Sequence, residues 1–166
     1  SELSANTALD SHGGGILNTG GAWATVQDTV VSLNGAFNGG GISNDNIDTA
    51  LVLVRVEVQG NTAANDGGGI NNGGTLQLVD SAVEANSANN YGGGIQSFSG
   101  ATELIRTSVS GNQSFIGGGL SNFPDAEATL FASTVAGNET TNRGGGIVNQ
   151  SYLALTNTRI ASNSAG

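Results

Sequence analysis

Residues 66–95 read DGGGINNGGTLQLVDSAVEANSANNYGGGI, so a glycine triplet recurs after 25 residues, with apolar residues at fixed places in between. A flexible linker would not keep its leucines and valines in step with its glycines. The same phrase occurs six times, with triplets that begin at Gly13, Gly39, Gly67, Gly92, Gly117 and Gly144. A period of 25 to 28 residues is typical of a protein built from stacked repeats.

The first repeated pattern is the triplet with its flanking residues. An isoleucine or leucine follows each triplet, and asparagine stands two residues further on in five of the six copies, at Asn18, Asn44, Asn72, Asn122 and Asn149. Ser97 replaces asparagine in the remaining copy. Stacked carboxamides donate and accept hydrogen bonds along a column, so these five residues predict a structural asparagine ladder.

Two further patterns lie between the triplets. One has the form [ST]-x-[VIL]-x-x-N, as in Ser81/Val83/Asn86 and Thr107/Val109/Asn112. The other is L-x-L, best preserved at Leu51/Leu53, Leu76/Leu78 and Leu153/Leu155. In each pattern the apolar residues lie two apart, which is the period of a β-strand with one buried face.

Together the patterns predict an all-β fold. Three short strands per coil of ~26 residues cannot bury an apolar face alone, but stacked coils pair each strand with its copies above and below. We therefore expect a right-handed parallel β-helix, or β-solenoid, of about six coils that forms one domain over residues 1–166. The glycine triplets would then supply positive φ and close backbone approach at one corner of every coil.

Charged residues occupy a column of their own. Two residues beyond the second position of L-x-L stand Asp28, Arg55, Asp80 and Arg106, whose signs alternate from coil to coil. Opposite charges at one-coil spacing form exposed pairs, whereas a slip by one coil would place like charges together. The column predicts a charge ladder that helps to set the register of the coils.

The composition excludes several classes of partner. The chain has 166 residues, a net charge of −9 and no lysine, and it contains neither cysteine nor methionine. Nucleic acids and anionic membrane surfaces both require basic patches, so neither is expected as a partner. No apolar run approaches the ~18 residues that a membrane-spanning helix needs, so membrane insertion is not expected.

The phrase GGG[IL]-x-N, joined to [VI]-x-x-N-x-[AST], resembles the repeats of polymorphic outer membrane proteins and related bacterial surface β-helix proteins. The resemblance covers essentially the whole chain, although glycine stands third in the triplet and Val, Leu or Ile replaces the phenylalanine of the family's F-x-x-N phrase. It implies an extracellular or cell-surface location and an adhesive or structural role, with cell-surface glycans or other surface proteins as possible partners.

A catalytic site is not expected. β-Helix enzymes that cleave polysaccharides need clustered carboxylates, and here the acidic residues are scattered along the sequence. A carbohydrate-active enzyme therefore remains only a third alternative. No cofactor is expected; the one alternative is Ca²⁺ bound near Asp45 and Asp48 in a loop.

The first and last coils read as ordinary repeats without caps. Open strand edges invite pairing, and a head-to-tail interface that does not close yields filaments. We therefore expect an extracellular structural protein whose subunits stack end to end. The expected stacking residues are Ser1, Leu3 and Asn6 at one end, and Leu153, Leu155, Thr158, Ile160 and Asn163 at the other. The alternative is a segment excised from the passenger of a larger, autotransporter-like adhesin.

Overall fold

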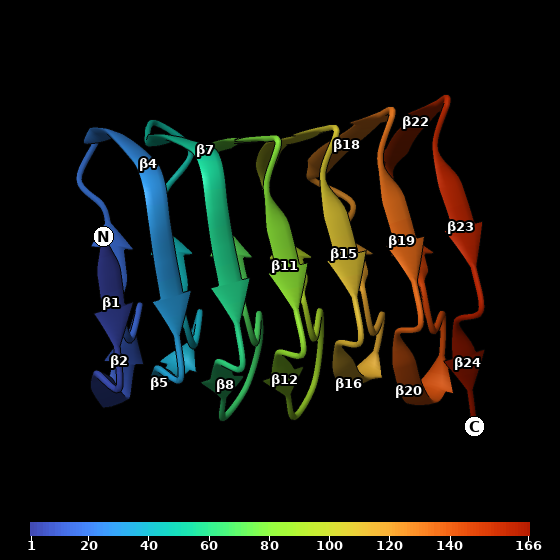
Figure 1. The fold of residues 1–166 in the computed structure, drawn as a ribbon, viewed down its shortest axis with the longest axis horizontal. Helices are drawn as coiled ribbons and strands as arrows, with labels where there is room; N and C mark the ends of the chain where they lie inside the picture. The colour runs from blue at the N-terminus through green and yellow to red at the C-terminus, as the bar shows by residue number, and fades with distance from the viewer.

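The computed structural model describes all residues from Ser1 to Gly166, and they form strands and turns without a helix. Figure 1 shows coils stacked side by side, with the N-terminus at one end of the row and the C-terminus at the other. The front strands run downward, and the chain returns behind them as it advances, so the coils wind in the right-handed sense. Every strand pair is parallel, which confirms the predicted β-solenoid of about six coils.

The largest sheet has eleven strands and bends at one corner of the coil. Its upper half contains β10 (Thr75–Val79), β14 (Gly100–Ile105), β18 (Ala126–Phe131) and β22 (Tyr152–Thr156). Its front half contains β1 (Glu2–Ser4), β11 (Ala82–Glu84), β15 (Ser108–Ser110), β19 (Thr134–Ala136) and β23 (Arg159–Ala161). The long strands β4 (Trp23–Ser32) and β7 (Ala50–Gln59) run through both halves.

Two smaller sheets complete the coil. The seven-stranded sheet contains β2 (Thr7–His12), β5 (Gly35–Asn38), β8 (Thr62–Ala63), β12 (Ser87–Ala88), β16 (Gln113–Ile116), β20 (Glu139–Arg143) and β24 (Ser164–Ala165). The six-stranded sheet contains β3 (Ile16–Asn18), β6 (Ile42–Asn44), β9 (Ile70–Asn72), β13 (Ile95–Ser97), β17 (Leu120–Asn122) and β21 (Ile147–Asn149).

The arrangement of strands within a coil differs in detail from the sequence prediction. The L-x-L and [ST]-x-[VIL] patterns share the bent sheet, while the extra strands of the seven-stranded sheet follow the asparagine of the second pattern. Apart from Ile116 in β16, the buried apolar residues of these extra strands are small: Ala36, Ala63 and Ala88. Their apolar signal is therefore too weak to be read from periodicity.

Each coil turns at three residues with positive φ. One corner uses the first glycine of each triplet, and a second uses Gly60, Gly111 and Gly137 or residues such as Leu33 and Ala85. The third corner is the bend of the large sheet, where φ lies between 49° and 52° at Asp28, Arg55, Asp80, Arg106, Ala132 and Asn157. The predicted charge column therefore coincides with a column of left-handed backbone.

The triplets are required for two separate reasons. The first glycine supplies the left-handed conformation, with φ of 64° at Gly67. The second lies against the next coil, so that a Cβ on Gly68 would stand 2.4 Å from the carbonyl oxygen of Gly93. Such a distance is far inside van der Waals contact, so only glycine lets neighbouring coils pair at this corner.

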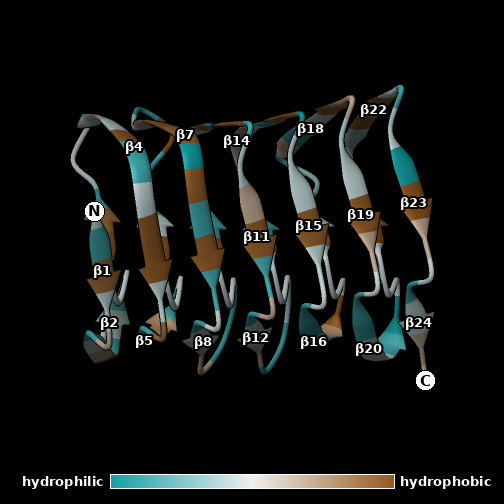
Figure 2. Cartoon of the chain, viewed as in Figure 1, coloured by the Kyte–Doolittle hydropathy of each residue, from teal (hydrophilic) through white to brown (hydrophobic).

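The core is a stack of aliphatic side chains contributed by every coil. Seventeen buried residues form one cluster, which includes Ile70 and Ile95 from the triplet pattern and Leu76 and Leu78 from L-x-L. Figure 2 shows how apolar segments recur at the same height of successive front strands. Burying each such side chain contributes about 1.5–3 kcal/mol before the entropy of ordering the chain is subtracted.

Candidate functional site

A ladder of seven asparagines runs the length of the solenoid. In each rung Nδ2 donates to Oδ1 of the next coil at 2.9–3.0 Å, through Asn6, Asn34, Asn61, Asn86, Asn112, Asn138 and Asn163. The same Oδ1 accepts the backbone N–H of the preceding asparagine, and Nδ2 also donates to a backbone carbonyl of the coil before. The five inner members are at most 2 % exposed, and their amides are fully hydrogen-bonded.

The long ladder has a direction. Every carboxamide donates toward the C-terminal end and accepts from the N-terminal side. At the first coil no group donates to Oδ1 of Asn6, and at the last coil the backbone N–H of Asn163 has no acceptor. The two ends therefore present complementary hydrogen-bonding groups.

The five asparagines of the triplet pattern form two shorter runs. Asn18 donates to Asn44 at 2.7 Å and Asn44 to Asn72 at 2.8 Å, while Asn122 donates to Asn149 at 2.7 Å. The break lies at Ser97, whose hydroxyl is too short to continue the column and contacts Thr102 instead. Asn72 turns to Oγ1 of Thr102 and the carbonyl of Gly74.

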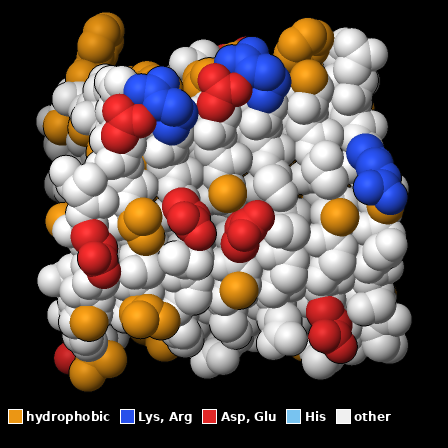
Figure 3. All heavy atoms as spheres, in the orientation of Figure 1, with side chains coloured by type: hydrophobic (Ala, Val, Ile, Leu, Met, Phe, Trp, Pro, Cys, Tyr) orange, Lys and Arg blue, Asp and Glu red, His pale blue; other side chains and the backbone are white.

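The charge column consists of two separate ion pairs. Arg55 donates through Nε and Nη2 to Asp28 at 2.6 and 2.9 Å, and Arg106 donates in the same way to Asp80 at 2.5 and 2.8 Å. Figure 3 shows two neighbouring contacts between blue and red side chains along the upper edge of the front face. No hydrogen bond links Arg55 to Asp80, although their charges attract each other across one coil.

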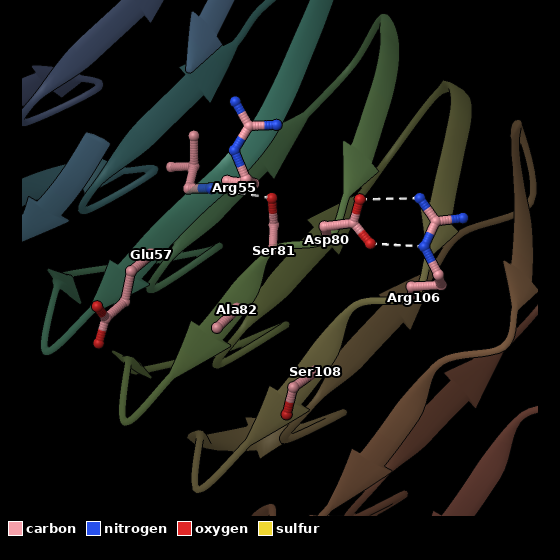
Figure 4. Close-up of a pocket in the computed structure, with 8 residues that line it drawn as sticks. Arg55, Glu57, Asp80, Ser81, Ala82, Arg106 and Ser108 are labelled. Carbon is pink, nitrogen blue, oxygen red and sulfur yellow. Dashed lines mark hydrogen bonds and ion pairs between the residues drawn. The ribbon is translucent and has the colours of Figure 1, made fainter. Parts of the chain in front are cut away.

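An open groove of about 430 Å³ lies beside these pairs. Figure 4 shows Arg55 and Arg106 above it and Glu57, Ala82 and Ser108 along the front strands below. Both guanidinium groups are committed to carboxylates, so the groove offers no concentrated charge of either sign. Its shape and composition do not indicate a catalytic site.

Acid should weaken the two ion pairs. The hydrogen bond from Arg55 lowers the pKa of Asp28 below 3.8, and that from Arg106 does the same for Asp80. A carboxyl group whose pKa is lowered in the folded state stabilises the fold at pH values above 3.8. This contribution is lost as the pH falls from 3.8 through the lowered pKa. Burial raises the pKa of Asp66 in the folded state. Protonation of this carboxyl group at low pH therefore favours the folded state, which is opposite to the effect of Asp28 and Asp80.

We predict that the Asp28→Asn/Asp80→Asn variant loses less stability on acidification than the unchanged chain. Urea unfolding followed by circular dichroism at a series of pH values between 6 and ~2 measures the difference. Asp125→Asn, in an exposed loop without an ion-pair partner, is the matched control and should follow the unchanged chain. Identical acid dependence in all three proteins would contradict the assignment.

The suggested calcium loop is occupied by other contacts. Asp45 accepts a hydrogen bond from Ser43 and is hydrogen-bonded to Nδ1 of His12 at 2.5 Å, whereas Asp48 is exposed. No group of three or more His, Cys, Asp or Glu side chains is placed to hold a metal ion. Ca²⁺ binding here remains a prediction that no contact in the structure favours.

The predicted stacking residues lie on the open edges of the solenoid. Ser1, Leu3 and Asn6 belong to the first front strand and its corner, and the N-terminal ammonium group donates to the carbonyl of Asp28 at 2.8 Å. At the other end lie Leu153, Leu155, Thr158, Ile160 and Asn163, of which Leu155 and Ile160 are exposed. Neither edge is covered by a helix or a loop (Figure 1).

The strand pairing aligns further residues in rows that run along the solenoid, with one residue from each coil. Glu2 begins an outward row on the front half, and Arg159 ends that row in the last coil. Trp23 and Tyr152 begin and end another row, on the upper half. The second sequence pattern already aligns Arg159 with outward positions of the preceding coils, whereas the partners of Glu2, Trp23 and Tyr152 follow from the strand pairs.

The open edges are unequal. The front half contains seven paired strands, and the seven-stranded sheet has the same number. The upper half and the six-stranded sheet each contain six. A second copy placed on the last coil can therefore pair its strands directly with that coil only along the front half and the seven-stranded sheet.

The architecture is the parallel β-solenoid that the resemblance to surface repeats implied. No helix in the structure is long and apolar enough to cross a membrane. Among known proteins, no family model, no curated protein and no solved structure matches this chain.

Proposed function

We propose that the protein is a structural component of a cell surface whose solenoid pairs head to tail with a second copy. The direction of the seven-asparagine ladder is the observation that carries this proposal. Asn163 would donate to Oδ1 of Asn6 in the next copy, as each inner asparagine donates to its neighbour. Head-to-head contact would place two acceptors together, and tail-to-tail contact two donors.

The open strand edges support the same direction. Strand β23 would pair with β1 of the next copy, and β24 with β2, by continuing the parallel register of the inner coils. Each backbone hydrogen bond gained contributes about 1 kcal/mol net. The same register would bring Glu2 of the next copy against Arg159, so that the junction gains an ion pair.

An extracellular or cell-surface location is part of the proposal. The repeat phrase GGG[IL]-x-N supports it through its resemblance to bacterial surface β-helix repeats. The net charge of −9 disfavours nucleic acids and anionic membranes as partners. The scattered carboxylates favour a structural role over a polysaccharide-cleaving enzyme.

Charge reversal at the proposed junction tests the role. Sedimentation velocity over a concentration series should show growing assemblies for the unchanged chain and markedly smaller ones for Arg159→Glu or Glu2→Arg. The double variant Glu2→Arg/Arg159→Glu restores opposite charges across the junction and should recover assembly. Glu127→Arg carries the same charge change as Glu2→Arg on an exposed residue of β18, which is paired on both sides by β14 and β22, and should assemble normally.

Recovery in the double variant is the decisive result, because a general effect of charge would not be reversed by a second change. Equal assembly of the unchanged chain, the two single variants and the double variant would show that the edges do not meet in the proposed register. Single particles at every concentration of the unchanged chain would contradict the head-to-tail role itself.

The unequal edges favour a second candidate. A copy stacked flush on the front half leaves a strand's width unfilled beside the six-stranded sheet. Further repeats of the same chain would fill that space, as in the passenger segment of a larger surface adhesin. In that case the isolated chain should remain monomeric, and a longer product of the gene that adds coils should unfold at a higher temperature.

A further inference from the structure

The outer surface of the six-stranded sheet is closed, although sheet surfaces of this kind usually face water. Side chains alternate along a strand, and the residues after Ile42, Ile70, Ile95 and Leu120 point away from the core. Even so, these outward residues are at most 3 % exposed: Ser43, Asn71, Gln96 and Ser121. Side chains from the flanking turns must therefore cover them.

Two contacts bridge this outer surface. His12 precedes the first triplet and reaches Asp45, which follows β6 in the next coil. Tyr91 precedes the triplet at Gly92 and meets Phe123, which follows β17 one coil later. The ring centroids of Tyr91 and Phe123 lie 4.8 Å apart at an interplanar angle of 69°. Because they approach from opposite ends of the strands, the two rings close over Gln96 and Ser121.

Gln96 is unusual among the buried amides of the chain. It is 1 % exposed, and neither Nε2 nor Oε1 has a hydrogen-bond partner. Ser121, its neighbour in the row, donates to the carbonyl of Ile116 instead. The asparagines of the long ladder show that this fold can satisfy buried amides fully, and an unpaired buried amide destabilises a fold.

We propose that Gln96 and the aromatic pair Tyr91–Phe123 form a binding site for a single sugar residue. The rings act as a clasp that separates when the sugar enters and then packs against it. Phe98, which is partly exposed and lies against Gly73 in the preceding coil, contributes a third ring at the same end of the strands.

The chemistry of the cluster suits an uncharged polyol with an apolar face. A glutamine amide donates through Nε2 and accepts through Oε1, which matches two adjacent hydroxyl groups. Aromatic rings pack well against the C–H face of a pyranose, since they combine apolar area with a fixed orientation. No cation lies in the cluster, and the half-buried Asp66 one coil before Tyr91 disfavours an anionic ligand.

Nuclear magnetic resonance of the full chain tests the site directly. The side-chain amide signal of Gln96 is followed while D-galactose, D-glucose, D-mannose and N-acetyl-D-glucosamine are added separately. At least one sugar should produce a saturable shift of that signal and should weaken the cross-peaks between the Tyr91 and Phe123 rings. Gln96→Leu removes both hydrogen-bonding groups without emptying the space, and should lower the affinity about tenfold or more.

Gln113→Leu and Phe115→Ala are the matched controls, because both residues are exposed on the seven-stranded sheet, and they should leave the affinity unchanged. Tyr91→Ala removes one arm of the clasp and should weaken binding while the Gln96 amide remains. The proposal is overturned if none of the four sugars shifts the Gln96 signal. It is also overturned if Gln96→Leu binds sugar with the affinity of the unchanged chain. The same holds if Gln96→Leu raises the stability of the fold while neither the unchanged chain nor any variant binds sugar.

Discussion

Replacing Gly68 by alanine is expected to disrupt the middle of the solenoid. The new Cβ would stand 2.4 Å from the carbonyl oxygen of Gly93 and 2.5 Å from the carbonyl group of Ser87. Both obstacles are backbone atoms of the next coil, so the contact cannot be relieved by a change of side-chain rotamer. The coils must separate locally, and we expect a loss of at least ~3 kcal/mol of unfolding free energy.

Two other glycines separate this steric effect from backbone conformation. Gly137 has φ of 64° but no atom within 4 Å of its Cβ position, so alanine should cost only ~1–2 kcal/mol. Gly35 lacks a positive φ, and its nearest neighbour lies at 3.9 Å, so alanine should change stability by no more than ~0.5 kcal/mol. Urea unfolding of the three variants measures the series. Equal losses at Gly68 and Gly137 would show that coil spacing is not what the triplet maintains.

Replacing Asn86 by alanine is the second change with a large expected effect. Its Oδ1 accepts from both the backbone N–H and Nδ2 of Asn61, and its Nδ2 donates to the carbonyl of Val58 and to Oδ1 of Asn112. Alanine would leave several of these buried groups unpaired. Since each costs about 1–3 kcal/mol, we expect a total loss of ~3–5 kcal/mol.

Asn6→Ala is the control for the ladder. Asn6 is exposed and its Oδ1 accepts no hydrogen bond within the chain, so loss of its side chain should cost less than ~1 kcal/mol. Thermal unfolding and amide hydrogen exchange of Asn61 and Asn86 distinguish the two positions. A small effect of Asn86→Ala would mean that strand pairing alone holds the coils in register.

The repeat patterns predict the fold because every coil must present the same backbone to its neighbours. Ile70 and Ile95 follow their triplets at the same distance, and the structure pairs them directly. The bend of the large sheet could not be predicted, since it depends on a left-handed conformation at residues such as Arg55 and Asp80 that carry no glycine signal.

The side-chain contacts on which the proposals rest were harder to predict. Both asparagine columns indicate stacked carboxamides, but spacing does not reveal that one column is unbroken while Ser97 divides the other into two runs. Alternating charges predict attraction along the column, but not that the direct contacts fall into two pairs, with Arg55 bonded to Asp28 and Arg106 to Asp80. The bridge between Tyr91 and Phe123 depends on how loops of unequal length fold over a strand, which spacing does not reveal.

Negative-stain electron microscopy of the purified chain over a concentration series tests head-to-tail pairing most directly. We expect unbranched fibres a few nanometres wide whose number rises with concentration, and we expect them to disappear in Arg159→Glu and to return in Glu2→Arg/Arg159→Glu. Monodisperse single particles at the highest concentration would contradict the account, and would favour a solenoid that continues in further repeats of the same chain.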